Sequence, residues 1–265
     1  IWLLRDRLKA RRLLLPAIVC PALAEALRLR LPALELEFYG VSADLRANYP
    51  AQLDADSALV ITHYFGYHAE VPRYAQGWVI EDRSHTLLKP PPLHGAFAFA
   101  SLRKLYPVAD GGEVLGSHSV RYEPDTNAQG SDRQGRSSWA EAQQDEQALD
   151  RWPPVCDISS ASLRTVLSTD THAAVERRRR NESLLRAGLP FGAPLPAYST
   201  RECPLTHLRL FESERERDWL RQRLMDQGIY TSIQWPTSRQ LPPGEIRQQA
   251  ETWARLHLAF PVGEH

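Results

Sequence analysis

Three side chains between residues 78 and 112 have types that could together hold a cofactor. Asp82 closes a short apolar run, and His85 follows three residues later. Lys104 stands further along the chain, ahead of a turn-forming Asp-Gly-Gly sequence. A carboxylate, an imidazole and an amine supply an anion for a ring nitrogen, a donor for a phenolic oxygen and a nucleophile for a Schiff base. Pyridoxal phosphate (PLP) is the cofactor that needs these three groups.

Each of these residues also has an ordinary structural interpretation. An acid at a strand end often caps the next helix, a loop histidine is usually satisfied locally, and a lysine usually lies in solvent. Apolar neighbours surround Lys104, so we expect its amine to be partly desolvated and therefore nucleophilic. The chain has only two other lysines, Lys9 in a basic helix face and Lys89 before three prolines.

Composition excludes several classes of protein. The 265 residues are 43% hydrophobic and 24% charged, with a net charge of zero, so nothing favours nucleic acid or an anionic membrane as a partner. No apolar run reaches the roughly 20 residues of a membrane span. Three widely spaced cysteines predict a reduced, cytoplasmic protein, and none of the nine histidines shows the paired spacing of a metal site.

Short apolar runs alternate with helical patterns in the first part of the chain, which predicts a mainly parallel sheet flanked by helices. Ligands bind at the carboxyl ends of such strands, where His63, Asp82 and His85 fall. His63 is therefore a further candidate for the pocket, with a structural loop as its alternative. Strands are expected at 13–15, 34–39, 58–61 and 78–80, and helices at 1–12 and 21–31.

The second part of the chain predicts a smaller α+β unit. A polar stretch at 123–147 indicates a linker or surface excursion, and 163–185 indicates one long helix. We expect two domains: a cofactor domain over 1–160, and a helix with a small C-terminal α+β lobe over 161–265. Within the lobe, strands are expected at 205–211, 229–235 and 258–261, and helices at 214–227 and 243–256.

The order of several segments resembles one known family. They are 14–21, 62–66 (THYFG), 80–85 (IEDRSH), 101–112 (SLRK to DGG), 178–181 and 228–236. In this order they resemble the DegT/DnrJ/StrS-type aminotransferases, fold-type I α/β enzymes that use PLP, many of which aminate keto sugars on nucleotide carriers. The resemblance covers most of the chain, and its acid-histidine and lysine motifs are specific only in combination.

The resemblance implies a role for each candidate residue. Lys104 would form the aldimine with PLP and shuttle the proton, Asp82 would pair with the pyridine nitrogen, and His85 would contact the ring oxygen. Ser101 would contact the phosphate. Cys20 takes the position where many members carry an aromatic residue that stacks on the ring.

The resemblance implies transfer of an amino group from an amino acid, such as glutamate, to a keto sugar. It also implies a homodimer whose active sites lie at the subunit interface. The family's phosphate-binding turn would lie before Ile1, so the sequence is consistent with a truncated or divergent member whose cofactor domain lacks that turn. Two alternatives stay open. One is another PLP reaction such as sugar dehydration, where the lysine is typically a histidine. The other is a degenerate homologue with a binding or regulatory role.

Overall fold

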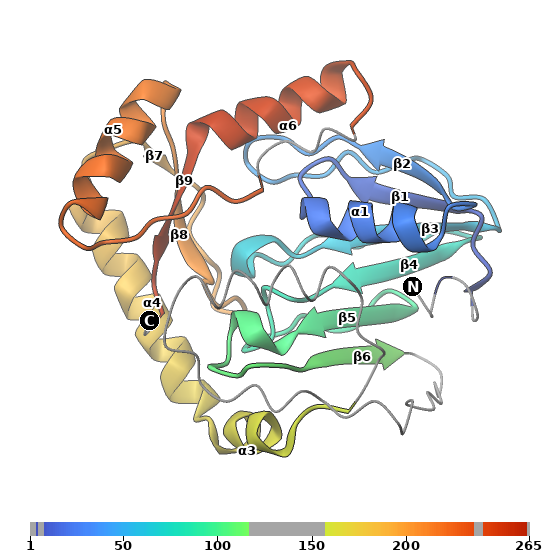
Figure 1. Cartoon of the computed structure of the whole chain (residues 1–265), viewed down its shortest axis with the longest axis horizontal. Coiled ribbons are helices and arrows are strands. Elements are labelled where there is room, and N and C mark those ends of the chain that lie inside the picture. Colours follow the sequence, from blue (N-terminus) through green and yellow to red (C-terminus); the bar gives the residue numbers. More distant parts are fainter. Residues whose placement is uncertain (1–3, 5–7, 117–156, 236–240, 264–265) are drawn as a thin grey trace.

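Two sheets form the centre of the protein in the computed structural model (Figure 1). The structure describes residues 4, 8–116, 157–235 and 241–263. The larger sheet has the order β2-β1-β3-β4-β5-β6, in which β1 to β5 run parallel and β6 runs antiparallel to β5. Its strands are β1 (Arg12–Pro16), β2 (Glu35–Tyr39), β3 (Ser57–Thr62), β4 (Trp78–Asp82), β5 (Phe97–Ser101) and β6 (Gly112–Gly116).

The smaller sheet lies beside the larger one, with α4 and α5 on its outer side (Figure 1). Its order is β7-β8-β9, and both pairs are antiparallel. The strands are β7 (Ala193–Pro194), β8 (Thr206–Leu210) and β9 (His257–Pro261), and the helices of the chain are α1 (Pro21–Arg30), α3 (Ser160–Ser168), α4 (Thr171–Gly188), α5 (Glu214–Met225) and α6 (Glu245–Leu256). The α/β fold class with a small C-terminal lobe is confirmed.

β3 has the sequence and the burial expected of a central parallel strand. All six of its residues (SALVIT) are buried, as expected for a parallel strand with both faces covered. One face packs against Leu27 of α1, and the other belongs to a core that includes Leu208 of β8 and Trp253 of α6. The two parts of the chain therefore share one apolar core. The domain boundary at residue 160 remains a prediction; α3 begins at that residue.

Two expected elements of the second part are wrong. The single helix at 163–185 is two helices, because Asp170 caps α4 by accepting a hydrogen bond from the backbone nitrogen of Ala173 at 2.9 Å. The strand at 229–235 is absent, and Ser232 makes one isolated bridge to Ala259 instead. β5 and β6 were not foreseen. The polar stretch at 123–147 and most of the expected helix at 1–12 lie outside the described residues.

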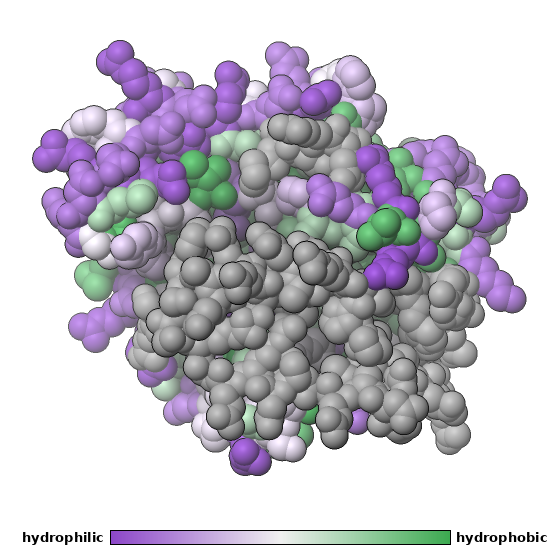
Figure 2. All heavy atoms as spheres, in the orientation of Figure 1, coloured by the Kyte–Doolittle hydropathy of each residue, from purple (hydrophilic) through white to green (hydrophobic). Residues whose placement is uncertain are grey.

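Where Figure 2 colours the surface by hydropathy, it is mostly hydrophilic, and apolar side chains form small separate spots. Among the described residues, no helix is both long enough and apolar enough to cross a membrane.

A tight turn after β3 joins the two parts of the chain. Phe65 and Gly66 both have positive φ angles, 53° and 107°. The carbonyl oxygen of Phe65 accepts a hydrogen bond from the backbone nitrogen of Leu205 at 2.8 Å. A Cβ atom at Gly66 would overlap the carbonyl oxygen of Cys203. Only glycine suits this position, because both the backbone angle and the close approach exclude a side chain.

We therefore expect Gly66→Ala to lower the free energy of unfolding by about 2–4 kcal/mol, from backbone strain and overlap together. Gly188→Ala is the matched control, because a Cβ atom there has no neighbour within 4 Å. It should leave stability unchanged or raise it by up to about 1 kcal/mol. Urea denaturation of both variants measures the difference, and equal midpoints would contradict the prediction.

Candidate active site

The carboxyl ends of four neighbouring parallel strands lie at one edge of the larger sheet, and the candidate residues follow these ends. Cys20 comes after β1, His63 after β3, Asp82 at the end of β4, and Ser101 at the end of β5. This arrangement follows from the parallel topology, since parallel strands present their carboxyl ends on the same side.

Lys104 and His85 are in direct contact at this edge. Lys104 lies on the short helix η3 (Leu102–Lys104), which follows β5, and its Nζ lies 2.9 Å from Nε2 of His85. The Lys104 side chain is exposed, so the desolvation predicted from its apolar neighbours is not found. Its amine is positioned by the histidine and also lies 5.7 Å from the centre of the Trp235 ring.

His85 is buried and held on every side. The backbone nitrogen of Phe65 donates to its Nδ1 at 3.1 Å. The rings of Phe65 and Trp235 lie nearly parallel to the imidazole, with centres 5.2 and 5.4 Å away. Burial, and then the charge of Lys104, lower the pKa of His85 well below its usual value. The imidazole is therefore neutral, and because Nδ1 accepts a hydrogen bond, its proton is on Nε2.

A cavity of about 310 Å³ lies between Lys104 and the C-terminal lobe. His85 and Lys104 line one side, and the lobe contributes the other. The lobe residues are Leu205, Thr206, Tyr230, Ser232, Gln234, Ala259 and Pro261. Its volume is at the lower end of the range for ligand pockets. Sequence reasoning missed the lobe's hydroxyl and amide groups, because no local pattern connects residues 230–234 to Lys104.

The other predicted cofactor residues lie near this pair without touching it. Oδ1 of Asp82 accepts a hydrogen bond from the backbone nitrogen of Ser84 at 3.0 Å. The backbone nitrogen of Ser101 donates to the hydroxyl of Ser84 at 3.2 Å, and the Ser101 hydroxyl does not cap η3. Cys20 is a partly exposed free thiol at the N-cap position of α1. Among the described residues, no hydrogen bond joins Asp82, Ser101 or Cys20 to Lys104.

His63 lies behind the edge, with no exposed surface. Its Nε2 donates to Glu81 at 3.0 Å, and its Nδ1 accepts from the backbone nitrogen of Ala69 at 3.0 Å. The substrate contact predicted for His63 is therefore not available in this structure, and the structural alternative describes its position.

Glu81 is the centre of this buried group and was not singled out from the sequence. Its side chain is fully buried and accepts hydrogen bonds from His63, from both Nε and Nη2 of Arg83, and from the backbone nitrogens of His94 and Gly95. Burial alone would raise the pKa of Glu81, but these donors outweigh it and lower the pKa to about 2. Alternation along β4 turns Glu81 and Asp82 to opposite faces of the sheet, and Glu81 is buried while Asp82 is partly buried.

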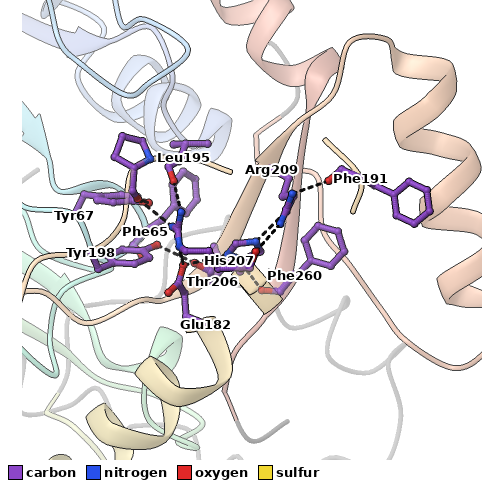
Figure 3. Close-up of polar contacts among 12 residues, drawn as sticks. Phe65, Tyr67, Glu182, Phe191, Leu195, Tyr198, Thr206, His207, Arg209 and Phe260 are labelled. Atoms are coloured by element: carbon purple, nitrogen blue, oxygen red, sulfur yellow. Dashed lines mark hydrogen bonds and ion pairs between the residues drawn. The ribbon is translucent and has the colours of Figure 1, made fainter. Parts of the chain in front are cut away.

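Polar side chains tie the lobe to the turn beside His85 (Figure 3). The Tyr198 hydroxyl lies 3.1 Å from the carbonyl oxygen of Phe65 and 2.8 Å from that of Thr206. The ring of Tyr67 stacks on Tyr198 at 4.1 Å. The turn that positions His85 is therefore attached directly to β8, which lines the opposite side of the cavity.

Another buried histidine fixes β8 itself (Figure 3). Nε2 of His207 accepts a hydrogen bond from Arg209 at 3.1 Å, and its Nδ1 donates to Glu182 of α4 at 3.2 Å. Arg186 also donates to Glu182 at 2.8 Å. These contacts lock α4 against the lobe sheet, away from the cavity.

Solved structures share this architecture. An aminotransferase, TlmJ, from Streptoalloteichus hindustanus superposes with a TM-score of 0.66 at 17% identity, over 96% of this chain and 75% of that one. A sugar aminotransferase, Spr1654, from Streptococcus pneumoniae in its PMP form gives 0.67 at 13%, over 96% and 77%. A DegT DnrJ EryC1 StrS aminotransferase from Brucella abortus gives 0.61 at 15%, over 96% and 74%. The fold is that of the DegT-type sugar aminotransferases.

Sequence comparison alone does not reach this aminotransferase fold. No protein-family model matches the sequence, and no curated protein is similar enough to count as a match. The predicted fold-type I architecture is confirmed by structure, at identities of 12–17% across the neighbours. Structural similarity at such identities establishes the fold alone, so the chemistry has to be argued from the residues of the site.

The Glu81 cluster makes a testable contribution to stability. Its folded-state pKa is lowered, so the stabilisation is present above about pH 4.5 and is lost as the pH falls towards 2. The shift corresponds to about 3 kcal/mol. Glu81→Gln should cost about 3–5 kcal/mol at pH 7, because the buried guanidinium of Arg83 loses its counter-charge.

The acid dependence gives the sharper measurement. Denaturation of Glu81→Gln between pH 7 and pH 3 should lose less stability than the native protein does over the same range. Glu25→Gln, at an exposed position on α1, is the control and should behave like the native protein. An equal loss of stability between pH 7 and pH 3 in the native protein and in Glu81→Gln would contradict the role of this carboxylate.

Proposed function

We propose that this protein is a PLP-dependent aminotransferase that moves an amino group from an amino acid to a keto sugar. The observation that carries the proposal is the pair formed by Lys104 and His85 on an open cavity, at the strand edge of a fold shared with sugar aminotransferases. The fold alone would not suffice, because one fold hosts many activities. The further support is the accessible amine of Lys104 beside the fixed His85, an arrangement suited to carbonyl chemistry.

The side chains present fit the ring end of PLP. Asp82 uses one carboxylate oxygen to hold Ser84, and its Oδ2 has no hydrogen-bond partner in the described part of the chain. A half-buried carboxylate with a spare oxygen suits a protonated ring nitrogen. His85 offers an Nε2 proton, which suits a ring oxygen, and the exposed amine of Lys104 can reach a carbonyl carbon.

These residues divide the work of the proposed reaction. When bound, PLP supplies the aldehyde that takes up the amino group and a ring that stabilises negative charge on the substrate carbon. Lys104 would carry the proton between substrate and cofactor as a general acid and base. Asp82 would keep the ring nitrogen protonated, and Ser101 would contribute a hydroxyl to the phosphate. The free thiol of Cys20 would lie at the ring without stacking on it.

The proposal also covers the amino donor, the acceptor, the assembly and the cellular compartment. Glutamate is the proposed donor and a nucleotide-linked keto sugar the proposed acceptor, and the protein would act as a homodimer in the cytoplasm. The hydroxyl of Ser232 and the amide of Gln234 support a polyhydroxy acceptor, since both residues line the cavity and can hydrogen-bond an uncharged sugar ring. Both described cysteines, Cys20 and Cys203, are free thiols, as a reducing compartment requires.

Absorption spectroscopy tests the proposal. The purified protein mixed with PLP should develop the near-visible band of a Schiff base, borohydride should remove the band and fix the cofactor on Lys104, and glutamate should bleach it. Lys104→Arg should abolish the band and lower transaminase activity by about a thousandfold or more. Lys89→Arg, whose amine is bound to the carbonyl oxygen of Thr200, is the matched control and should behave like the native protein.

Two outcomes would overturn this assignment. A band that persists unchanged in Lys104→Arg would place the chemistry elsewhere. The absence of any band with PLP would favour the alternative, a homologue of the fold with a binding or regulatory role.

A further inference from the structure

We propose that His257 is a positioning residue for the candidate active site. Its imidazole holds the backbone at Gln234, and through that contact it keeps the ring of Trp235 in place. The Trp235 ring covers His85 and lies beside the amine of Lys104. The part of His257 in a reaction rests on the proposed function, whereas the contact itself can be tested without cofactor or substrate.

One backbone pair ties the segment at 230–235 to β9. Ser232 and Ala259 exchange two backbone hydrogen bonds, at 3.0 and 2.9 Å. In an antiparallel ladder the next pair of this kind lies two residues further along, which here is Gln234 with His257. That pair cannot form in full through the backbone, because the N–H of His257 closes α6 by donating to the carbonyl oxygen of Trp253.

The side chain of His257 supplies an acceptor for Gln234 instead. Its Nε2 accepts a hydrogen bond from the backbone nitrogen of Gln234 at 2.7 Å. Its Nδ1 donates to the carbonyl oxygen of Trp253 at 2.7 Å, so the neutral ring carries its hydrogen on Nδ1. Burial lowers the pKa of His257 to about 4, and the ring therefore keeps this form at neutral pH.

Packing fixes the imidazole of His257 in this orientation. The residue has no exposed surface, and its ring stacks on that of Trp253 with centres 4.3 Å apart and planes 11° apart. Trp253 is itself buried and stacks on Phe65. Because the ring is held at its face and at both nitrogens, the point at which Nε2 accepts a hydrogen bond is fixed as well.

Trp235 has a backbone conformation that requires such support. Its φ angle is 54°, in the left-handed region, and residues other than glycine keep this conformation only where their neighbours enforce it. The bond from Gln234 to His257 fixes the chain one residue before this position. The Trp235 ring then lies 5.4 Å from the imidazole of His85, nearly parallel to it, and 5.7 Å from Nζ of Lys104.

Loss of the acceptor at His257 would therefore act locally. The N–H of Gln234 would lose its partner beside a strained residue, and Trp235 would move away from His85. The earlier part of the segment would stay in place, because the backbone of Ser232 is paired and the side chain of Ile233 packs into an apolar cluster of the lobe.

Histidine acylation tests the proposal on the intact, PLP-free protein. Diethylpyrocarbonate at pH 7 transfers an ethoxycarbonyl group to accessible neutral imidazoles, and peptide mass spectrometry measures the rate at each histidine. His257→Phe keeps a flat ring against Trp253 and removes the acceptor. Acylation of His85 should become about tenfold faster, because an unsatisfied N–H favours the open segment. His63, which has no exposed surface, should stay protected and shows that the variant is folded.

Two further variants isolate the acceptor. His257→Gln can place its side-chain oxygen where Nε2 lies, so it should restore most of the protection of His85. His172→Phe, at an exposed position on α4, controls for the loss of a histidine and should behave like the native protein. Unchanged protection of His85 in His257→Phe would overturn the proposal, and so would equal rates in His257→Phe and His257→Gln.

Hydrogen exchange of the native protein decides the case in which His257→Phe does not fold. The backbone amide of Gln234 should exchange as slowly as that of Ser232, which is paired with β9. A Gln234 amide that exchanges at the rate of an unprotected amide would contradict the role of His257 without any variant.

The outcomes separate this role from the proposed function. Faster acylation of His85 in His257→Phe, in a protein that gives no band with PLP, would support the positioning role and reject the aminotransferase. A PLP band on Lys104 together with unchanged protection of His85 in His257→Phe would keep the aminotransferase and remove the role of His257.

Discussion

The carboxylate of Glu81 holds together the loops that carry the candidate active site. Its five hydrogen-bond donors come from the segment after β3, the turn after β4 and the chain just before β5. A buried carboxylate is tolerated only when its charge and lone pairs are satisfied, so these segments have to meet at one point. Asp82 and His85 lie next to these segments along the chain, and Lys104 follows at the other end of β5, so the positions of all three depend on that point.

The cavity belongs to both parts of the protein. The side formed by the large domain packs against the Phe65–Gly66 turn, and the side formed by the lobe includes β8. Hydrogen bonds from Leu205 and Tyr198 to Phe65 connect the turn to β8. The shared apolar core around Trp253 adds to these bonds. The two sides of the cavity therefore form a continuous packed unit, and the spacing between Lys104 and the lobe hydroxyls is set by the same contacts that stabilise the fold.

Much of the fold and part of the site were predictable from the sequence. Apolar runs located β1, β3 and β4, and alternation located the edge strand β2. Lys104 and His85, which residue type and spacing had singled out, are in contact in the structure. The break between α3 and α4 was missed because a single cap at Asp170 outweighs a continuous helical pattern. Glu81 and the lobe residues at 230–234 were missed because their roles come from partners distant in sequence, which local periodicity does not contain.

Two of the histidines beside the site have the same orientation of hydrogens. In both His63 and His85 a backbone N–H occupies Nδ1, which leaves Nε2 as a donor. At His63 the donor is used inside the protein, on Glu81. At His85 it points to the cavity, where a guest that displaces the lysine must offer an accepting atom. A carbonyl or phenolate oxygen meets this requirement and an N–H group does not. The backbone N–H of Phe65, by occupying Nδ1 of His85, therefore selects for ligands that place an accepting atom at Nε2.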